Sequence, residues 1–339
     1  MEARGHELVV TARSKEISVE LLERFGIPYR LISTQRSGGL GLAREMVERT
    51  WRLMGIVRRV RPDVLTGIMG PSIALAGRLC RVPAVIFYDT EFARQTNRFA
   101  YPLATAVCTP DCYRERVRGR HVTYPGYHEL AYLHPNRFTP DPSKLAAFGL
   151  SAEEPYSLLR FVSWKASHDT GEVGLTPAQK LQLAEALGAH GRVVASSEGP
   201  LPEALRPLEL KGPREEVHHL IAFAQMVVGE SATMTSEAAV LGVPAVFIAT
   251  TGRGYTDDQE ERYGHVRWLR EGDFPEALRA IEHFMAWGPR AIGAAARERL
   301  LAEKIDVTRW MVEWFEREME GRAGARRRHG GHAAPDGAS

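Results

Sequence analysis

The 339-residue sequence has few cysteines, little net charge and no long hydrophobic run. Cys80, Cys108 and Cys112 are odd in number, and only the last two lie close together. No second Cys or His pair at metal-ligand spacing accompanies them, so structural or free thiols are favoured over half of a metal site. A formal net charge of +2 gives no indication of a nucleic-acid partner.

No apolar run approaches the roughly 18 residues that span a membrane, and the N-terminus has no signal-peptide pattern. We therefore predict a cytoplasmic protein without a transmembrane segment. What the sequence does contain is ordinary for a soluble globular protein, with 44% hydrophobic and 25% charged residues. Its length suffices for two domains of about 150 residues, each with its own core.

Short runs rich in Val and Ile alternate with amphipathic stretches along the chain, which is typical of β-α-β units and a parallel sheet. In the first half we predict strands over 6–12, 27–32, 63–68, 84–88, 106–109 and 121–124, and helices over 14–25 and 42–60. The second helix is predicted to stop before Arg61 and Pro62, because a proline disfavours helical backbone in the residue before it.

A second series of the same kind follows, with strands over 156–164, 192–196, 226–228 and 245–248 and helices near 177–187, 275–287, 291–301 and 306–319. Prolines and Gly149 interrupt both periodicities over 140–155, so we expect the domain boundary there. We predict an N-terminal domain over 1–150, a C-terminal domain over 151–320, and a disordered tail over 321–339.

The most informative segment is 227–248, VVGESATMTSEAAVLGVPAVFI, which predicts a strand, a small-residue turn, a helix beginning near Met234 and a second strand. A helix start presents free backbone N–H groups and a positive dipole end, which favours a phosphate or diphosphate. Glu237 falls about one turn into the helix, where its carboxylate could accept hydrogen bonds from ribose hydroxyls. The alternative is a helix-capping or surface contact. The candidate nucleotide-binding residues of this segment are Gly229, Glu230, Ser231, Ala232, Thr233, Met234 and Glu237.

Several segments resemble known proteins. GESATMTSEAAVLG at 229–242 is similar to the nucleotide-binding half of the GT-B fold, which UDP-N-acetylglucosamine 2-epimerases and many glycosyltransferases share. Together with RFVSWKASHDTG at 160–171, FYDTEFA at 87–93 and YPGYHELAYLHPNRFTPDP at 124–142, it resembles an uncharacterised archaeal and bacterial family, domain of unknown function 354. The resemblance implies two Rossmann-like, parallel-sheet domains facing a cleft.

The resemblance also implies site residues. A Glu of the epimerases corresponds to Glu91, a catalytic His to His168, and the ribose-binding Glu of the fold to Glu237. With Asp89 and Asp169 these residues form a candidate acid/base set at the carboxyl ends of the strands, where parallel sheets place their ligand sites. Each could instead cap a turn.

Two departures from these relatives matter. The epimerases carry an Asp after the strand that corresponds to 63–68, whereas this chain reads Met69-Gly70-Pro71-Ser72, which makes epimerisation less favoured. The sequence given does not include the strand and the Gly- or His-containing loop that usually open the fold. If the true start lies upstream, we expect a central strand of the first sheet and an acceptor-side loop there. If Met1 is the true start, we expect an exposed sheet edge that would reduce stability or recruit a partner such as a second copy.

Basic residues after strand ends complete the candidate site. Arg160, Lys165, Arg214 and Arg253 could neutralise a diphosphate, although each could equally be a solvated surface charge. The leading hypothesis is a glycosyltransferase that needs neither metal nor cofactor and joins a sugar from a nucleotide donor, UDP-linked by resemblance, to an unknown acceptor. The alternatives are an epimerase or hydrolase of the same donor and a noncatalytic binding protein.

Overall fold

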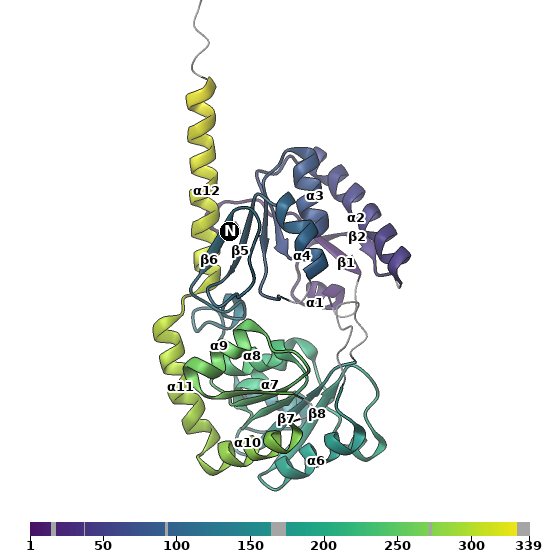
Figure 1. Cartoon of the computed structure of the whole chain (residues 1–339), viewed down its shortest axis with the longest axis vertical. Helices are drawn as coiled ribbons and strands as arrows, with labels where there is room; N and C mark the ends of the chain where they lie inside the picture. The colour runs from purple at the N-terminus through teal and green to yellow at the C-terminus, as the bar shows by residue number, and fades with distance from the viewer. Residues whose placement is uncertain (15–17, 37, 92–93, 164–173, 271–272, 331–339) are drawn as a thin grey trace, which may run out of the picture.

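The computed structural model describes residues 1–14, 18–36, 38–91, 94–163, 174–270 and 273–330. It contains two α/β domains, each built around parallel strands (Figure 1). All three cysteines are free thiols, and Cys108 is buried in the core of the first domain. None of the described helices combines the length and the apolar composition that a membrane crossing requires.

The described strands of the first domain fall into two sheets. One pairs β1 (Val10–Ser14) with β2 (Tyr29–Thr34), and the other has the order β3 (Leu65–Ile68), β4 (Ala84–Phe87), β5 (Ala106–Pro110) and β6 (His121–Tyr124). All pairs are parallel, as predicted. The helices of this domain are α1 (Ser18–Arg24), α2 (Gly39–Val60), α3 (Pro71–Cys80), α4 (Arg94–Ala100) and α5 (Leu130–Leu133). The first-domain strands are thus divided between β1–β2 and β3–β6, where the sequence predicts one incomplete sheet.

The second domain has a single parallel sheet in the order β11-β10-β9-β7-β8. Its strands are β7 (Tyr156–Phe161), β8 (Arg192–Ser197), β9 (Val227–Gly229), β10 (Ala245–Ile248) and β11 (Val266–Leu269). Its helices are α6 (Pro177–Gly188), α7 (Val217–Phe223), α8 (Ala232–Leu241), α9 (Gly254–Tyr263), α10 (Phe274–Ala286) and α11 (Pro289–Glu303).

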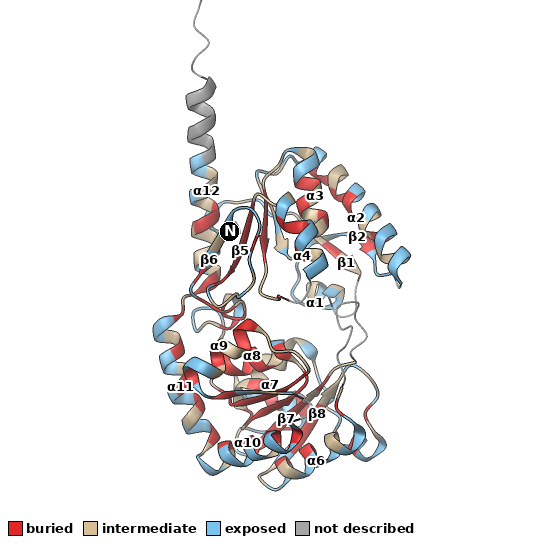
Figure 2. Ribbon diagram, in the orientation of Figure 1, coloured by how far each residue is buried: buried red, intermediate tan, exposed pale blue. Residues whose placement is uncertain are grey.

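Burial explains which strands of the second sheet were predictable. β9 and β10 are buried along their whole length (Figure 2), so their sequences are continuous apolar runs. β11 was not predicted, because it is a short edge strand in which only Val266 is buried and which includes the exposed Arg267.

The C-terminal helix α12 (Val307–Gly330) corrects two predictions. It leaves the second domain and runs along the first (Figure 1), where the Phe315 ring lies 5.8 Å from that of Phe87 and the Trp310 ring 5.1 Å from that of Tyr124. The second domain therefore does not keep this helix as its own. The helix also continues to Gly330, past residue 320 where a disordered tail was expected, because the Ala- and Arg-rich residues there have good helix propensity.

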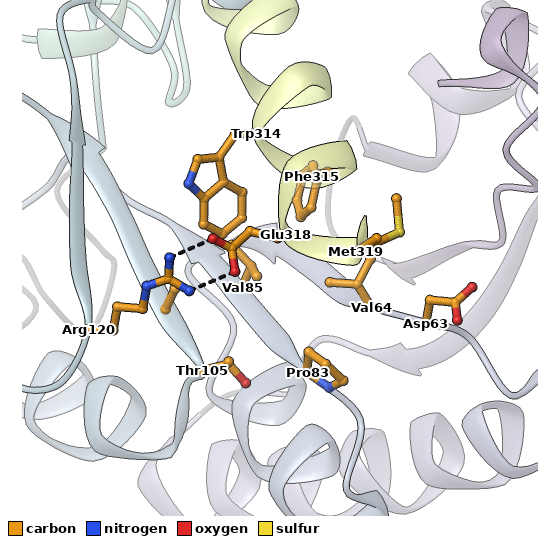
Figure 3. Close-up of a pocket in the computed structure, with 11 residues that line it drawn as sticks. Asp63, Val64, Pro83, Val85, Thr105, Arg120, Trp314, Phe315, Glu318 and Met319 are labelled. Atoms are coloured by element: carbon orange, nitrogen blue, oxygen red, sulfur yellow. Dashed lines mark hydrogen bonds and ion pairs between the residues drawn. The ribbon is translucent and has the colours of Figure 1, made fainter. Parts of the chain in front are cut away.

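Side chains at the sheet edge fasten α12 to the first domain. Arg120 donates two hydrogen bonds to Glu318, with N–O distances of 2.7 and 2.5 Å (Figure 3). Trp314, Phe315 and Met319 line a small pocket with residues at the ends of β3, β4 and β5. This pocket lies between packed elements at the amino edge of the sheet, away from the strand ends that carry the predicted site.

Direct contacts also join the two domains beside the cleft. The Tyr127 hydroxyl donates to Asp258 of α9 at 2.5 Å. The ammonium group of Lys304, which is buried, lies 2.9 Å from Asp111 and 3.6 Å from Asp258. Segments from both domains are therefore in direct contact through hydrogen bonds and ion pairs to Asp258.

Candidate functional site

The predicted strand-turn-helix is present at the carboxyl edge of the second sheet. β9 ends at Gly229, and α8 begins at Ala232 with Ser231 as its N-cap. The Ser231 hydroxyl accepts a hydrogen bond from the backbone N–H of Met234, at 3.3 Å. The first N–H groups of any α-helix have no carbonyl partner within the helix. Those at the start of α8 can therefore donate hydrogen bonds to an anion.

Gly229 is required by close approach of two strands. A Cβ atom at this position would overlap the backbone carbonyl of Arg160 in β7, and the φ angle of Gly229 is 152°. The same carbonyl accepts a hydrogen bond from the N–H of Glu230 at 2.8 Å. The glycine therefore allows α8 to start directly over the end of β7.

Glu230 has a positioning role that the sequence did not indicate. Its side chain is only 2% exposed, and its two oxygens accept hydrogen bonds from the N–H groups of Val162 at 3.2 Å and Leu175 at 2.6 Å. Lys180 lies 3.6 Å away. The carboxylate thus joins Val162 and Leu175 to the start of α8. This positioning role differs from the predicted contact with a diphosphate.

Glu237 is buried one turn into α8, as predicted, and contacts two residues that the sequence analysis did not select. Its Oε1 atom accepts hydrogen bonds from the Tyr132 hydroxyl and from the Nε2 atom of His218, both at 3.0 Å. Burial and the neighbouring Glu237 carboxylate raise the pKa of Tyr132 well above its usual range. Glu237 is therefore held in place by side chains from α5 and α7.

A second carboxyl group, that of Glu129, lies close to Glu237 and was also missed. Glu129 is 3% exposed, and its Oε2 atom has no hydrogen-bond partner. Burial, followed by the negative charge of Asp89, raises the pKa of Glu129 to about 8. Glu129 is therefore a neutral acid near pH 7.

Asp89 lies at the carboxyl end of β4 and faces this group. It accepts a hydrogen bond from Thr90 at 3.0 Å, and its charge acts on Glu129 and on Tyr255 of α9. Thr233, in the first turn of α8, also acts on the pKa of the buried Tyr255 side chain. The predicted catalytic Asp89 and the predicted diphosphate-binding helix start are therefore both neighbours of Tyr255.

Glu91 is brought to a different point. Its carboxylate accepts hydrogen bonds from the N–H of Arg114 at 3.3 Å and from the N–H of Gly254 at 3.4 Å, and burial raises its pKa. A Cβ atom at Gly254 would collide with this carboxylate. Glu91 therefore caps the start of α9 and joins the two domains, while Asp89 alone of the pair faces Glu129.

Arg160 and Arg253, two of the predicted basic residues, hydrogen-bond groups close to them in the second domain. Arg160 donates to Ser196 at 2.9 Å and to Glu198 at 2.8 Å, and Arg253 donates to backbone and hydroxyl oxygens of Thr251 and Gly252. Arg214 is exposed at the start of a short 3-10 helix before α7. Lys165, His168 and Asp169 lie outside the described residues, in segment 164–173.

The missed residues had a detectable signal. Glu129 and Tyr132 follow β6 just as Asp89 and Glu91 follow β4, and the carboxyl ends of parallel strands meet at one edge. Applying the strand-end rule to HELAY at 128–132 would have selected both. His218 had only its position in the first turn of an apolar helix, α7, to suggest a role.

The sequence of this chain is similar to those of known glycosyltransferases. No family model matches the chain. It is 44% identical over 77 residues to UDP-N-acetylglucosamine-N-acetylmuramyl-(pentapeptide) pyrophosphoryl-undecaprenol N-acetylglucosamine transferase of Symbiobacterium thermophilum, which is 22% of this chain and 19% of that enzyme. It is 22% identical over 271 residues to the enzyme of the same name from Haemophilus influenzae, covering 76% of this chain and 72% of the relative. The chain therefore matches well under two thirds of the first of these relatives.

Solved structures match over most of the chain. UDP-GlcNAc 2-epimerase from Neisseria meningitidis, bound to UDP-GlcNAc, gives a TM-score of 0.62 at 13% identity and covers 88% of this chain and 93% of that one. MurG of Acinetobacter baumannii gives 0.52 at 16% identity, over 93% and 92% of the two chains. Identities this low establish architecture alone, and with the two parallel-sheet domains described above they show that this chain has the GT-B fold.

Proposed function

We propose that the protein binds a nucleotide sugar, with UDP as the nucleotide, and transfers the sugar to an acceptor hydroxyl without a metal ion. The observation that carries this proposal is that Glu237, one turn into α8, and Asp89, after β4 of the other domain, both act on the buried carboxyl group of Glu129. A helix start supplies donors for a diphosphate, and a carboxylate one turn later supplies an acceptor for ribose hydroxyls. The relatives named above, which act on or bind UDP-linked sugars, support the same choice of ligand.

The donor half of the site would act as follows. The diphosphate binds the free N–H groups in the first turn of α8, with the Ser231 cap fixing that turn. Glu237 binds the ribose, and Tyr132 and His218 hold its carboxylate in place. The remaining oxygen of the carboxylate, Oε2, is the group available to the ribose.

The transfer step would be a single displacement. The acceptor oxygen attacks the anomeric carbon of the sugar and loses its proton to Asp89, and the bond from that carbon to the diphosphate oxygen breaks. The electron pair leaves with the diphosphate, whose added charge is stabilised by the α8 dipole. Glu129, which keeps its proton near pH 7, acts as a hydrogen-bond donor beside Asp89.

Transfer is favoured over epimerisation by the residues that follow β3. Met69, Gly70, Pro71 and Ser72 provide no carboxylate there, and Ser72 accepts a hydrogen bond from Arg49 at 2.8 Å. An epimerase that abstracts a proton from a sugar carbon would miss an acidic group at this strand end. Hydrolysis of the donor is the alternative reaction, in which water attacks the sugar in place of the acceptor hydroxyl.

Calorimetric titration with UDP tests the donor half of the proposal. We expect Glu237→Ala to weaken UDP binding about tenfold or more, which is roughly 1.4 kcal/mol, because two ribose hydrogen bonds to a charged group are lost. Glu185→Ala, on the exposed face of α6 in the same domain, is the matched control and should leave the affinity unchanged.

The chemical step is tested separately, by release of UDP from UDP-N-acetylglucosamine. Asp89→Asn should slow release by about 10²- to 10⁴-fold while UDP affinity stays near that of the wild type.

Unchanged UDP affinity in Glu237→Ala would reject the ribose role. Absence of UDP binding by the wild-type protein would reject the proposed function as a whole.

A further inference from the structure

A second pocket in the first domain carries an unusual concentration of arginines. It lies beside α4 and the loop that follows β5, has a cavity volume of about 180 Å³, and is open to solvent. This volume is below the roughly 300–1,000 Å³ of sites that enclose a whole small-molecule ligand, so the pocket has the size to hold one part of a ligand, such as a phosphate group. Its lining includes Arg94, Arg98, Asn97, Tyr113, Arg116 and Arg118.

The charges of this pocket are only partly balanced. Arg94 pairs with Glu115 at 3.2 Å, whereas Arg98, Arg116 and Arg118 form no ion pair with any carboxylate of the described residues. All four arginines are exposed to solvent and line one concave surface, which concentrates positive charge there. A phosphate would balance this charge and accept paired hydrogen bonds from the planar guanidinium groups.

The inner wall of the pocket has polar groups that a phosphate alone would not use. Asn97 is 7% exposed, and its Oδ1 atom has no hydrogen-bond partner. Its Nδ2 atom donates to the Glu91 carbonyl and to the Tyr113 hydroxyl, both at 3.4 Å, and the Tyr113 and Tyr101 hydroxyls are 2.8 Å apart. A buried acceptor without a donor favours a ligand that brings a hydroxyl group.

The pocket is continuous with the junction between the domains. Glu91 lines it, and the Glu91 carboxylate also accepts the N–H of Gly254 at the start of α9. Asp89, the proposed base, lies two residues earlier in the same loop. A ligand held by the arginines would therefore lie on the acceptor side of the proposed reaction.

We propose that this pocket binds the phosphate group of the acceptor, and that the acceptor is a hydroxyl compound bearing a phosphate ester or diphosphate. The assignment of the ligand as acceptor rests on the proposed function. The phosphate site itself rests only on the pocket, its arginines and Asn97. Free sugar phosphates and lipid-linked phosphates share this chemistry.

The test is calorimetry on the full chain with UDP at saturation, so that the α8 site is filled. Glucose 6-phosphate is the soluble probe, and glucose is its uncharged match. We expect glucose 6-phosphate to bind saturably and glucose not to bind. In the Arg98→Glu/Arg116→Glu variant, the affinity for glucose 6-phosphate should fall about tenfold or more. The Arg78→Glu/Arg206→Glu variant makes the same change in net charge at exposed sites outside the pocket and should bind like the wild type.

A second arm uses phosphatidylcholine vesicles that contain phosphatidic acid, with pure phosphatidylcholine vesicles as the match. Binding of either probe that depends on Arg98 and Arg116 supports the site, and the probe that binds assigns the source of the phosphate. Equal weakening in both double variants, or binding of neither probe, overturns the proposal. Circular dichroism verifies the fold of each variant, and Arg118→Gln is a milder second test with the same expected direction.

The two proposals can fail separately. Loss of UDP binding together with retained, Arg98-dependent binding of glucose 6-phosphate would reject the proposed function and leave a phosphate site. UDP binding without any phosphate binding in this pocket would reject the acceptor assignment alone.

Discussion

Glu129 is a carboxyl group that folding removes from water, and its position gives the stability of the protein a defined pH dependence. Its pKa rises from 4.5 to about 8 on folding, chiefly because burial disfavours the charged form. Between these values the folded chain binds more protons than the unfolded chain. The free energy of unfolding therefore falls as pH rises through this window, by up to roughly 1.4 kcal/mol per pH unit from this group.

The Glu129→Gln variant tests this effect, because the amide keeps the shape of the side chain and cannot ionise. We expect the variant to lose this part of the pH dependence and to be more stable than the wild type at about pH 8, with a smaller difference at about pH 5. Urea unfolding at several pH values is the measurement. Glu185→Gln, at an exposed position, should follow the wild type, and parallel pH curves for wild type and Glu129→Gln would refute a buried neutral acid.

At the scale of elements, Glu230 shows how a strand-turn-helix unit holds its surroundings. Its carboxylate joins the end of β7 through Val162 and the start of α6 through Leu175 and Lys180. Glu230→Ala would leave these buried donors without partners. We expect a loss of about 2–4 kcal/mol in the free energy of unfolding, measured with urea.

The control for this substitution is Glu198→Ala, which removes a more exposed carboxylate paired with Arg160. It should cost less than about 1 kcal/mol, as exposed ion pairs usually do. If Glu230→Ala were no more destabilising than Glu198→Ala, the positioning role of Glu230 would be wrong.

Glu230 and Glu237 also show what a sequence can reveal about a site. Both stand near the start of a helix that was predictable, because β9 and β10 are buried on both faces and read as unbroken apolar runs. Which carboxylate faces the cleft depends on partners from distant segments, Val162 and Leu175 for one and Tyr132 and His218 for the other. Local spacing cannot specify such partners.

For the whole molecule, most of the strand order was predictable, apart from β11, and the path of α12 was not. A helix was predicted over 306–319, but nothing in its apolar residues Trp310, Trp314 and Phe315 distinguishes one domain's surface from the other's. The choice is made by contacts with Phe87, Tyr124 and other residues more than 180 positions earlier in the chain. Glu129 was missed for the same reason, because its neighbours Asp89 and Ser236 belong to different domains.

β3 lies at an edge of the β3–β6 sheet in the first domain. Among the described strands, it pairs with β4 only. The N–H groups of Leu65 and Met69 donate to carbonyls of the β4 chain, at 2.8 and 2.9 Å, so the alternate residues Thr66 and Ile68 direct theirs to the other edge. We expect rapid amide hydrogen exchange at Thr66 and Ile68 and slow exchange at Ile86, whose strand is paired on both sides.

Exchange followed by NMR at low protein concentration measures this difference, with Ile86 as the internal reference. Protection of Thr66 and Ile68 equal to that of Ile86 would contradict an open edge. An open strand edge is a template for pairing with another strand, so protection that grows with protein concentration would mean that a second copy covers it. Protection independent of concentration would mean instead that the cover comes from the same chain, and β3 would then be an interior strand of one continuous sheet.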